Sequence, residues 1–420
     1  MTRQEAAFRS VSAAADTRAD PGSSARRDPS PAGAVGARTQ PGGHGVPQTS
    51  PTKPMRINFV FAKASMAGGV KSGRLLAEAA ARRGHDVRIL VPDPDRNPTP
   101  WWRAAIGRRR KGHKPAGGVQ RHHLERSSVE IVKVRHARVL ERHAPDADFT
   151  IANFWLAREW ISGWGEGKGV QGLMVRGHFP QFGHADRIEA AYRRGGVLLA
   201  IGTGLRKLLL EGGARSVGLV PNGVDWQQFG ADPRPRNALP RVGFLYGGSD
   251  SRKGADVMLE AHRLLTEAGV RHRLVAFGSR PLAHALPPDA EFRFRPPQGE
   301  IASIYRSCDC WVVPSRAEGF AMPGIEAAAC RCPVVATLCG GPEDYIDDGG
   351  SGFLVPVEDP PAMADAIARV LTCSADAWSA MSERSYANAR RFDWDVSAEL
   401  LERHLAGVLD GSVEVNPCRL

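Results

Sequence analysis

The sequence has few cysteines and no long apolar run, and both deficits limit what the protein can be. Seven cysteines in 420 residues are too few for a disulfide framework. No apolar stretch approaches the roughly 20 residues that a membrane-spanning helix needs. No hydrophobic signal segment precedes a small-residue cleavage site either. We therefore expect a cytoplasmic protein, with peripheral attachment to the inner membrane face as an alternative.

Metal and dinucleotide motifs are also lacking. Cys308-Asp309-Cys310 and Cys330-Arg331-Cys332 have one intervening residue, whereas zinc-binding pairs usually have about two to four, so we interpret them as core cysteines. Asp93-Pro94-Asp95 and Asp146-Ala147-Asp148 imitate a D-x-D metal motif, but we interpret them as turn residues. The glycines after the first predicted strand, Gly68-Gly69, do not form a G-x-G-x-x-G, so no dinucleotide site is indicated there. We expect neither a metal nor a bound cofactor.

The positive charge is concentrated in one region. The chain has a net charge of +11, yet residues 55–150 alone carry 20 basic and 9 acidic side chains, whereas residues 151–420 carry 29 and 32. This distribution suits a nucleic-acid-binding protein, an enzyme with anionic substrates or a protein on an anionic membrane. Trp101–Lys111 joins two tryptophans to a basic cluster, which indicates a solvated loop, a peripheral membrane contact or a patch for an anionic acceptor. No nucleic-acid motif accompanies the charge, so we expect no nucleic-acid partner.

Composition divides the chain into four parts. Residues 1–54 contain hardly any large apolar residues, which predicts a disordered tail; Met55 is an alternative start. Residues 55–230 and 241–380 both alternate apolar runs, glycine turns and helical segments, which predicts two α/β domains with parallel sheets. Residues 381–411 are predicted to be helical.

Ser315–Ala329 is the most informative stretch. It follows Cys310–Val313, an apolar run that predicts a strand buried on both faces. A polar turn comes next, and then a predicted helix in which Pro323 suits the first position. Free N–H groups at a helix N-terminus bind anions, and Glu318 and Glu326 flank this one. Because carboxylates accept hydrogen bonds from sugar hydroxyls, the pattern indicates a site for a nucleotide-sugar.

Three further segments follow predicted strands. Gly68-Gly69 follows the first strand and lets backbone approach a ligand closely. Arg252 and Lys253 lie in the glycine-rich turn after Val242–Tyr246, where they can neutralise a diphosphate. Leu173–Phe179 is predicted to be a short strand that delivers His178 near its carboxyl end, where ligands of open α/β sheets bind.

These motifs resemble those of the retaining glycosyltransferases of family 4, which have the GT-B fold. The resemblance covers about residues 55–411 and is strongest from Val242 to Pro356. The residues that carry it are Glu318 and Glu326, Asn222–Asp225, Pro333–Thr337, Gly340–Glu343 and Gly352–Pro356. It implies two Rossmann-like domains whose parallel sheets face a central cleft, with a C-terminal helix that crosses back to the first domain.

The resemblance also implies a function. It predicts a hexosyltransferase-like enzyme that moves a sugar from a nucleotide diphosphate-sugar to a hydroxyl acceptor, without metal and with retained anomeric configuration. Glu318 and His178 are implied as the catalytic residues near the transferred sugar, and Glu326 as the ribose ligand. The remaining donor-binding residues that it implies are Gly69, Arg252, Lys253, Gly319, Phe320 and Arg295.

The sequence departs from the family pattern at three positions. Gly248 stands where many members have an arginine, Ala321 where glycine is frequent, and Arg331 where glycine would suit a helix C-terminus. The residue types do not identify the nucleotide of the donor. They also leave open whether the acceptor is a saccharide, a lipid-linked compound or a small natural product. Rival interpretations are another enzyme on the same fold, a GT-B protein without transferase activity, and a basic nucleic-acid or membrane-surface binding protein.

Overall fold

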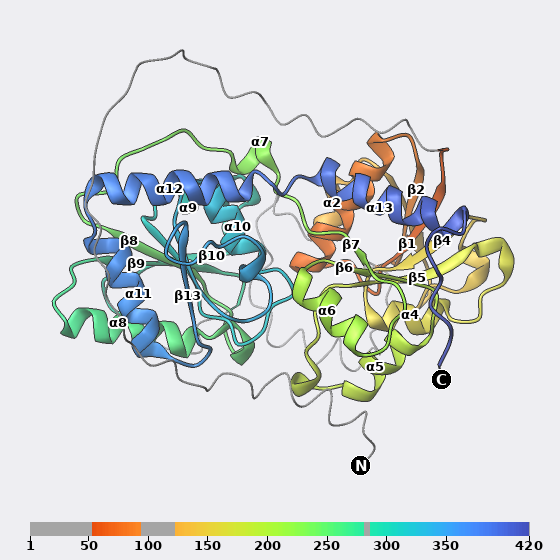
Figure 1. Ribbon diagram of the computed structural model, residues 1–420, viewed down its shortest axis with the longest axis horizontal. Helices are drawn as coiled ribbons and strands as arrows, with labels where there is room; N and C mark the ends of the chain where they lie inside the picture. The colour runs from red at the N-terminus through yellow and green to blue at the C-terminus, as the bar shows by residue number, and fades with distance from the viewer. Residues whose placement is uncertain (1–52, 94–121, 281–285, 420) are drawn as a thin grey trace, which may run out of the picture. The chain divides into compact units, whose positions relative to one another are not determined.

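The computed structural model describes residues 53–93, 122–280 and 286–419. Most of the predicted tail, 1–54, and the whole Trp101–Lys111 segment therefore lie outside the described residues. The described chain contains two separate parallel sheets, each with helices on both faces (Figure 1). The first sheet is built from strands before residue 220 and the second from strands after residue 240.

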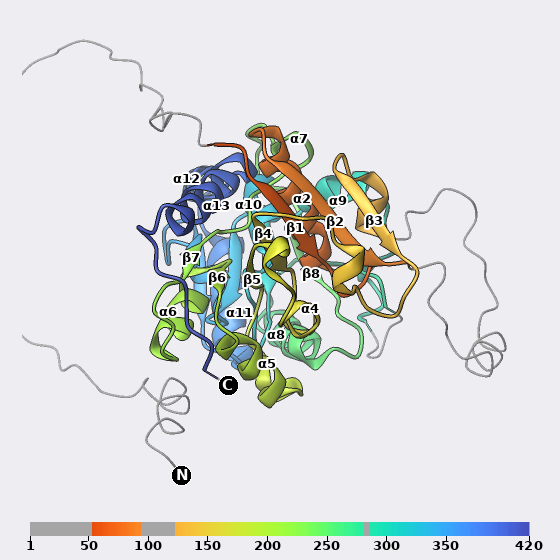
Figure 2. The same cartoon turned by 90° about the vertical axis from the view of Figure 1, so that its right-hand side faces the viewer.

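The first sheet has seven parallel strands in the order β3-β2-β1-β4-β5-β6-β7. Figure 2 shows β1, β2 and β3 side by side. Phe59 of β1 pairs with Ile89 of β2 and with Ile151 of β4. The elements are β1 Arg56–Val60, α2 Gly68–Arg82, β2 Asp86–Pro92, β3 Glu130–Val134, β4 Phe149–Ala152, α4 Trp155–Ile161, β5 Val170–Val175, α5 Ala185–Arg193, β6 Val197–Ala200, α6 Thr203–Glu211 and β7 Gly218–Leu219.

The second sheet has six parallel strands in the order β10-β9-β8-β11-β12-β13. Helices α9, α10 and α12 lie on one face and α8 and α11 on the other (Figure 1). The elements are α7 Trp226–Phe229, β8 Arg241–Leu245, α8 Ala255–Glu267, β9 Arg273–Gly278, β10 Glu291–Phe294, α9 Gln298–Arg306, β11 Cys310–Val313, α10 Met322–Ala329, β12 Val334–Thr337, β13 Gly352–Val355, α11 Pro360–Thr372, α12 Ala375–Ala389 and α13 Trp394–Leu409.

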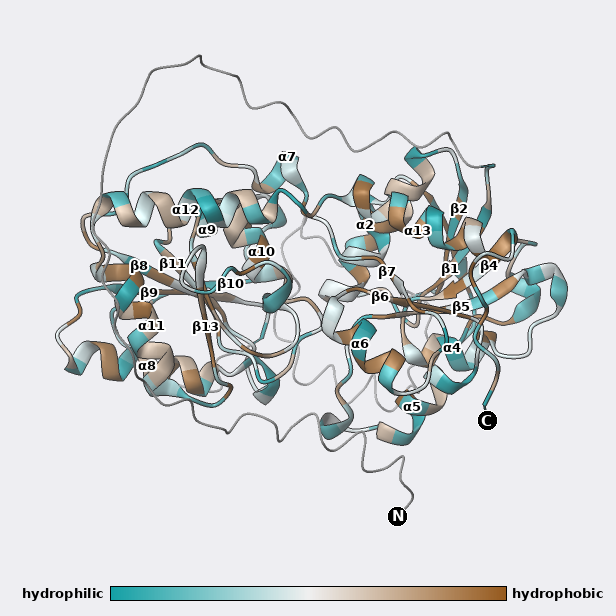
Figure 3. Cartoon of the chain, in the orientation of Figure 1, coloured by the Kyte–Doolittle hydropathy of each residue, from teal (hydrophilic) through white to brown (hydrophobic). Residues whose placement is uncertain are grey.

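The strands β4, β6, β11 and β12 are mostly apolar because helices cover both faces of each sheet. Every residue of β4, β6, β11 and β12 is buried, and hydrophobic colour runs along the strands in Figure 3. The buried strand predicted at Cys310–Val313 is confirmed. Trp311 in β11 is fully buried, and its ring packs edge-on against Tyr305 of α9 at 4.5 Å between centroids.

Helix α13 returns to the first sheet, as the resemblance implies. It begins at Trp394, after Asp393, whose side chain accepts a hydrogen bond from the Asp395 N–H at 2.7 Å. The helix packs against α2. Arg82 of α2 pairs with Asp395 at 2.6 Å.

Three local expectations need correction or comment. Pro323 is the second residue of α10, because Met322 begins the helix. The predicted strand Leu173–Phe179 ends at Val175, so His178 lies in the loop that follows. The two positions where glycine was expected do have left-handed backbone, with φ of 57° at Ala321 and 60° at Arg331. Both therefore hold a conformation that glycine adopts more readily.

Candidate functional site

A cavity of about 680 Å³ is lined from both sheets. Most of its lining residues lie at or after the carboxyl ends of β1, β4, β5 and β6 in the first sheet and of β8, β9 and β11 in the second. This is the edge at which open α/β sheets bind ligands. Seven of the site residues that were predicted from the sequence line this cavity: Gly69, Arg252, Lys253, Glu318, Gly319, Phe320 and Glu326.

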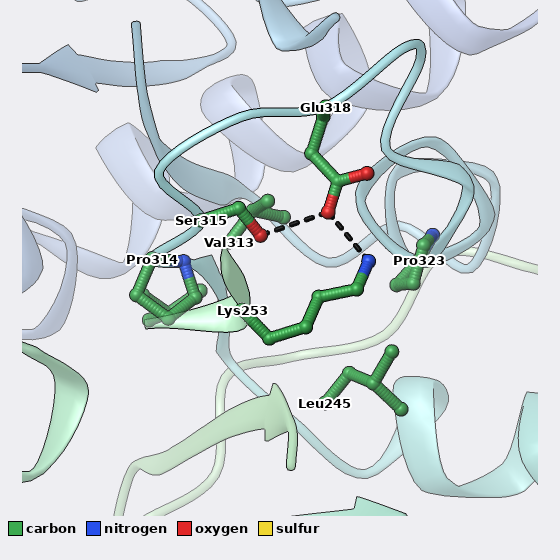
Figure 4. Close-up of a pocket in the computed structure, with 8 residues that line it drawn as sticks. Leu245, Lys253, Val313, Pro314, Ser315, Glu318 and Pro323 are labelled. Atoms are coloured by element: carbon green, nitrogen blue, oxygen red, sulfur yellow. Dashed lines mark hydrogen bonds and ion pairs between the residues drawn. The ribbon is translucent and has the colours of Figure 1, made fainter. Parts of the chain in front are cut away.

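Glu318 is held by a lysine and a serine. Its Oε1 accepts hydrogen bonds from Lys253 Nζ at 2.6 Å and from Ser315 Oγ at 2.8 Å (Figure 4). The guanidinium of Arg252 is 3.9 Å from the other carboxylate oxygen. Burial raises the pKa of Glu318, but the positive charges of Lys253 and Arg252 and the two hydrogen bonds outweigh burial and leave the pKa below its ordinary value. Glu318 is therefore an ionised, buried carboxylate.

This lowered pKa predicts an acid-sensitive contribution to stability. A carboxyl group whose pKa is lowered by folding stabilises the protein above its unfolded-state pKa, and the contribution disappears as pH falls through the folded-state pKa. Acidification below the ordinary value of 4.5 should therefore lower the melting temperature of the wild type more than that of Glu318→Gln. Thermal melts between about pH 6 and pH 3 test this. Glu166→Gln, at an exposed position, is the control and should follow the wild type; parallel curves for Glu318→Gln and wild type would refute the assignment.

Glu326 has both carboxylate oxygens engaged. Oε1 accepts from Lys71 Nζ at 2.6 Å, and Oε2 accepts from the Tyr305 hydroxyl at 3.1 Å. Lys71 belongs to α2 beside the first sheet, whereas Glu326 belongs to α10 beside the second. The sequence analysis missed Lys71 and Tyr305 because these contacts join residues far apart in the chain. A sugar hydroxyl that binds Glu326 has to share or replace one of them.

Two predicted site residues do not line the cavity. The His178 ring lies against Tyr192 of α5, with Nδ1 3.4 Å from the hydroxyl, and burial lowers the pKa of His178. Arg295 donates from Nε to the Ser279 carbonyl at 3.1 Å, and its guanidinium lies over the Phe294 ring. The structure therefore does not bring His178 and Arg295 together with Glu318, and their predicted roles stay predictions.

Position 248 has no room for a side chain. Gly248 has a φ of +67°, and an added Cβ would lie 2.6 Å from the Cβ of Arg280. Arg280 lines the cavity, so a different arginine occupies the space beside the residue where the family pattern expects one. Arg252 lies with its guanidinium 4.8 Å above the centroid of the Phe179 ring. The second-sheet side of the cavity thus contains three cationic side chains: Arg252, Lys253 and Arg280.

Gly319 allows two loops to touch. A Cβ added at Gly319 would lie only 1.9 Å from the backbone oxygen of Arg176. Gly319 follows β11 of the second sheet, and Arg176 follows β5 of the first. The close approach therefore requires glycine, because a backbone carbonyl cannot rotate away as a flexible side chain can.

The side chains of the Cys-x-Cys segments lie in the core, and those of Asp146 and Asp148 pair with basic residues. Cys308, Cys310, Cys330 and Cys332 are buried in the hydrophobic core, and burial raises the pKa of Cys308 to about 12. Asp146 pairs with Lys168 and Asp148 with Arg56, each at 2.9 Å; Pro94 and Asp95 lie outside the described residues. Within ranges 53–93, 122–280 and 286–419, no cluster of three or more His, Cys, Asp or Glu side chains could hold a metal.

Residues 240–373 match the model of the family described as glycosyl transferases group 1. This segment, about a third of the chain, is therefore similar to the group 1 glycosyltransferases. The D-inositol 3-phosphate glycosyltransferase of Saccharomonospora viridis is 34% identical to the chain over 218 residues, which are 46% of this chain and 50% of the relative. That of Corynebacterium jeikeium is 37% identical over 172 residues, which are 41% of this chain and 36% of the relative. The chain thus spans half or less of these curated relatives.

Solved structures show the same fold. Sucrose-phosphate synthase from Thermosynechococcus elongatus superposes with a TM-score of 0.62 at 17% identity, over 85% of this chain and 100% of that one. HepE from Anabaena, solved with UDP and glucose, gives 0.62 at 16% identity, over 84% and 100%. The two parallel sheets with a returning C-terminal helix are therefore the GT-B fold, which confirms the predicted fold class.

The group 1 segment contains only part of the site. Lys253, Glu318 and Glu326 lie within residues 240–373, whereas Lys71 and Arg176 lie outside them. The family match thus accounts for one wall of the cavity. The other wall lies outside the matched residues. No described helix is long and apolar enough to cross a bilayer.

Proposed function

We propose that the protein is a glycosyltransferase that moves a sugar from a nucleotide diphosphate-sugar to a hydroxyl acceptor, with retained anomeric configuration and without a metal. The observation that carries this proposal is the buried Lys253–Glu318 pair beside Arg252 at the cavity wall. The group 1 family match over this wall supports it. The HepE structures with UDP and with UDP-glucose, which share the fold, support a UDP-sugar donor.

Charge development gives each residue its role. Cleavage of the anomeric bond leaves negative charge on the departing diphosphate, and preorganised donors lower the barrier by stabilising that charge. Lys253, Arg252 and the N–H groups of Gly319 and Phe320 would supply this stabilisation, which is the role of a metal in other transferases. Once Lys253 turns toward the diphosphate, Glu318 becomes free to accept hydrogen bonds from the sugar hydroxyls.

The remaining groups position the substrates. Glu326 would bind the ribose hydroxyls in place of Lys71 or Tyr305. We propose that the acceptor hydroxyl attacks from the face that the diphosphate leaves, so that the leaving phosphate accepts the proton and the configuration is retained. His178 would orient the sugar or acceptor after a rotation away from Tyr192. Closure of the cavity around both substrates would exclude water and suppress hydrolysis.

A binding assay tests the donor class first. UDP, GDP, ADP and TDP should be compared by thermal shift, in EDTA and then with Mg²⁺. A ligand at 100 times its dissociation constant adds about 2.7 kcal/mol to stability, so one diphosphate should raise the melting temperature clearly in EDTA. NMR of the product formed from the matching sugar nucleotide should then show retained configuration. Absence of a shift with all four, or strict dependence on Mg²⁺, would contradict the proposal.

A further inference from the structure

Two glycines in the turn after β8 each lie against the stem of a basic side chain. A Cβ built on Gly247 would lie 2.5 Å from the Cβ of Lys253 and 2.7 Å from its Cγ. A Cβ built on Gly248 would lie 2.6 Å from the Cβ of Arg280 and 3.1 Å from its Cδ. A side chain at either position would therefore displace a basic stem. The glycine pair thus lets Lys253 and Arg280 pack on one turn, and both line the cavity.

Arg280 reaches this turn because β8 and β9 are neighbouring parallel strands. Leu245 of β8 pairs with Phe277 of β9, and the Tyr246 N–H donates to the Phe277 carbonyl at 2.8 Å just beyond the end of β8. The turns after the two strands therefore begin at the same level of the sheet. Arg280 follows Gly278, the last residue of β9. It thus lies at the carboxyl edge of the sheet, where ligands of open α/β sheets bind.

Arg280 differs from the other two cations of this wall in having no carboxylate partner. Lys253 pairs with Glu318 at 2.6 Å, and Arg252 pairs with Asp250 at 3.3 Å. Arg280 is exposed and makes no hydrogen bond or ion pair with any residue that the structure describes. An exposed, unpaired arginine is common on protein surfaces. Arg280 is unusual because its stem is fixed against a glycine and it lines a cavity.

We infer that Arg280 binds the diphosphate of the nucleotide-sugar donor together with Lys253, and that Gly248 is needed because it leaves room for Arg280. This inference rests on the proposed function, since it names a further ligand of the same donor. A guanidinium can donate two parallel hydrogen bonds to a phosphate. Lys253 and Arg252 each have to leave a carboxylate to do so, whereas Arg280 has none to leave. Arg280 therefore supplies affinity for the diphosphate that the other two cations do not.

A pair of ligands with and without the diphosphate tests the inference. UDP should be compared with uridine, or the corresponding pair for whichever diphosphate the thermal-shift panel selects, by calorimetry in EDTA and, for the nucleoside, by ligand-detected NMR. Arg280→Gln should weaken UDP binding by about tenfold or more and uridine binding by no more than about twofold, because only the diphosphate meets the guanidinium. Arg280→Lys should keep part of the UDP affinity. Arg263→Gln, which alters an exposed pair with Glu260 on α8, is the control and should bind both ligands like the wild type.

Gly248→Ala tests the packing of Arg280 separately. Its new Cβ would overlap the Arg280 stem, so Gly248→Ala should weaken UDP binding by about as much as Arg280→Gln does. In the Arg280→Gln background it should cause a further loss of no more than about twofold, because residues that act through one contact are not additive. The positive φ of residue 248 should lower the melting temperature in both backgrounds, so binding is measured well below the melting transition. Fully additive losses of UDP affinity would overturn the inference.

The binding measurements separate this inference from the proposed function. Wild-type affinity for UDP in Arg280→Gln, or equal losses for UDP and uridine, would overturn the inference while the proposed function stood. Absence of binding of every nucleoside diphosphate by the wild type would instead reject the proposed function. Circular dichroism and a melting curve check that Arg280→Gln is folded. Because Arg280 is exposed, this substitution should leave the melting temperature close to that of the wild type.

Discussion

Replacement of Lys253 by alanine should lower kcat for sugar transfer by about 10²–10³, the loss seen when one preorganised donor to a developing oxyanion is removed. Lys253 Nζ is the nearest cation to Glu318, at 2.6 Å, and both side chains are largely buried. The substitution removes a charge from the diphosphate site and leaves Glu318 with only the more distant Arg252. Steady-state kinetics with a saturating sugar nucleotide measures the effect.

Stability measurements separate the two consequences of this change. Because Glu318 loses its nearest cation and one of its two hydrogen bonds, Lys253→Ala should lower the free energy of unfolding by about 1–3 kcal/mol. The double variant Lys253→Ala/Glu318→Gln should recover much of that stability because it removes the charge, yet its kcat should be no higher than that of Lys253→Ala. Lys168→Ala breaks a surface pair with Asp146 and serves as the control. Wild-type kcat in Lys253→Ala would refute the assigned role.

Among additions of a single methyl group at the site, Gly319→Ala should cause the largest loss of stability and activity. The new Cβ would lie 1.9 Å from the Arg176 oxygen and 2.7 Å from its carbonyl carbon, so the backbone after β5 or β11 has to move. Overpacking of this kind destabilises by about 1–3 kcal/mol. A displacement of about 1 Å at reacting groups can reduce the rate about 10²-fold. Melting temperature and kcat/KM should therefore both fall.

Gly299→Ala provides the matched control. Gly299 lies in helix α9, and a Cβ added there meets no atom within 4 Å. Because alanine favours helix by up to about 1 kcal/mol over glycine, this variant should be at least as stable as the wild type and fully active. If Gly319→Ala behaved like Gly299→Ala, the contact between the two loops would not be needed for function.

Glycines and residues with left-handed backbone show which features could be predicted from the sequence and which could not. Ala321 and Arg331 were singled out as positions that suit glycine, and both have positive φ. Ala321 was singled out by the family resemblance, and Arg331 by the local pattern of a helix end. Gly248 also looked anomalous in sequence, but only the structure shows that Arg280 covers it. Nothing in the sequence connects residues 248 and 280, because their proximity results from the pairing of β8 with β9.

The sequence by itself determined the two parallel sheets, the buried strand at Cys310–Val313 and the placement of Glu318 and Lys253 after predicted strands. These follow from periodicity, glycine turns and chain order, which are local properties. Only the tertiary structure decided which charges meet. It paired Lys71 with Glu326, turned His178 toward Tyr192 and left one terminal nitrogen of Arg176 without a hydrogen-bond partner among the described residues. Side-chain partners of this kind depend on how separate loops converge at the sheet edges, and that convergence is set by packing of the whole chain.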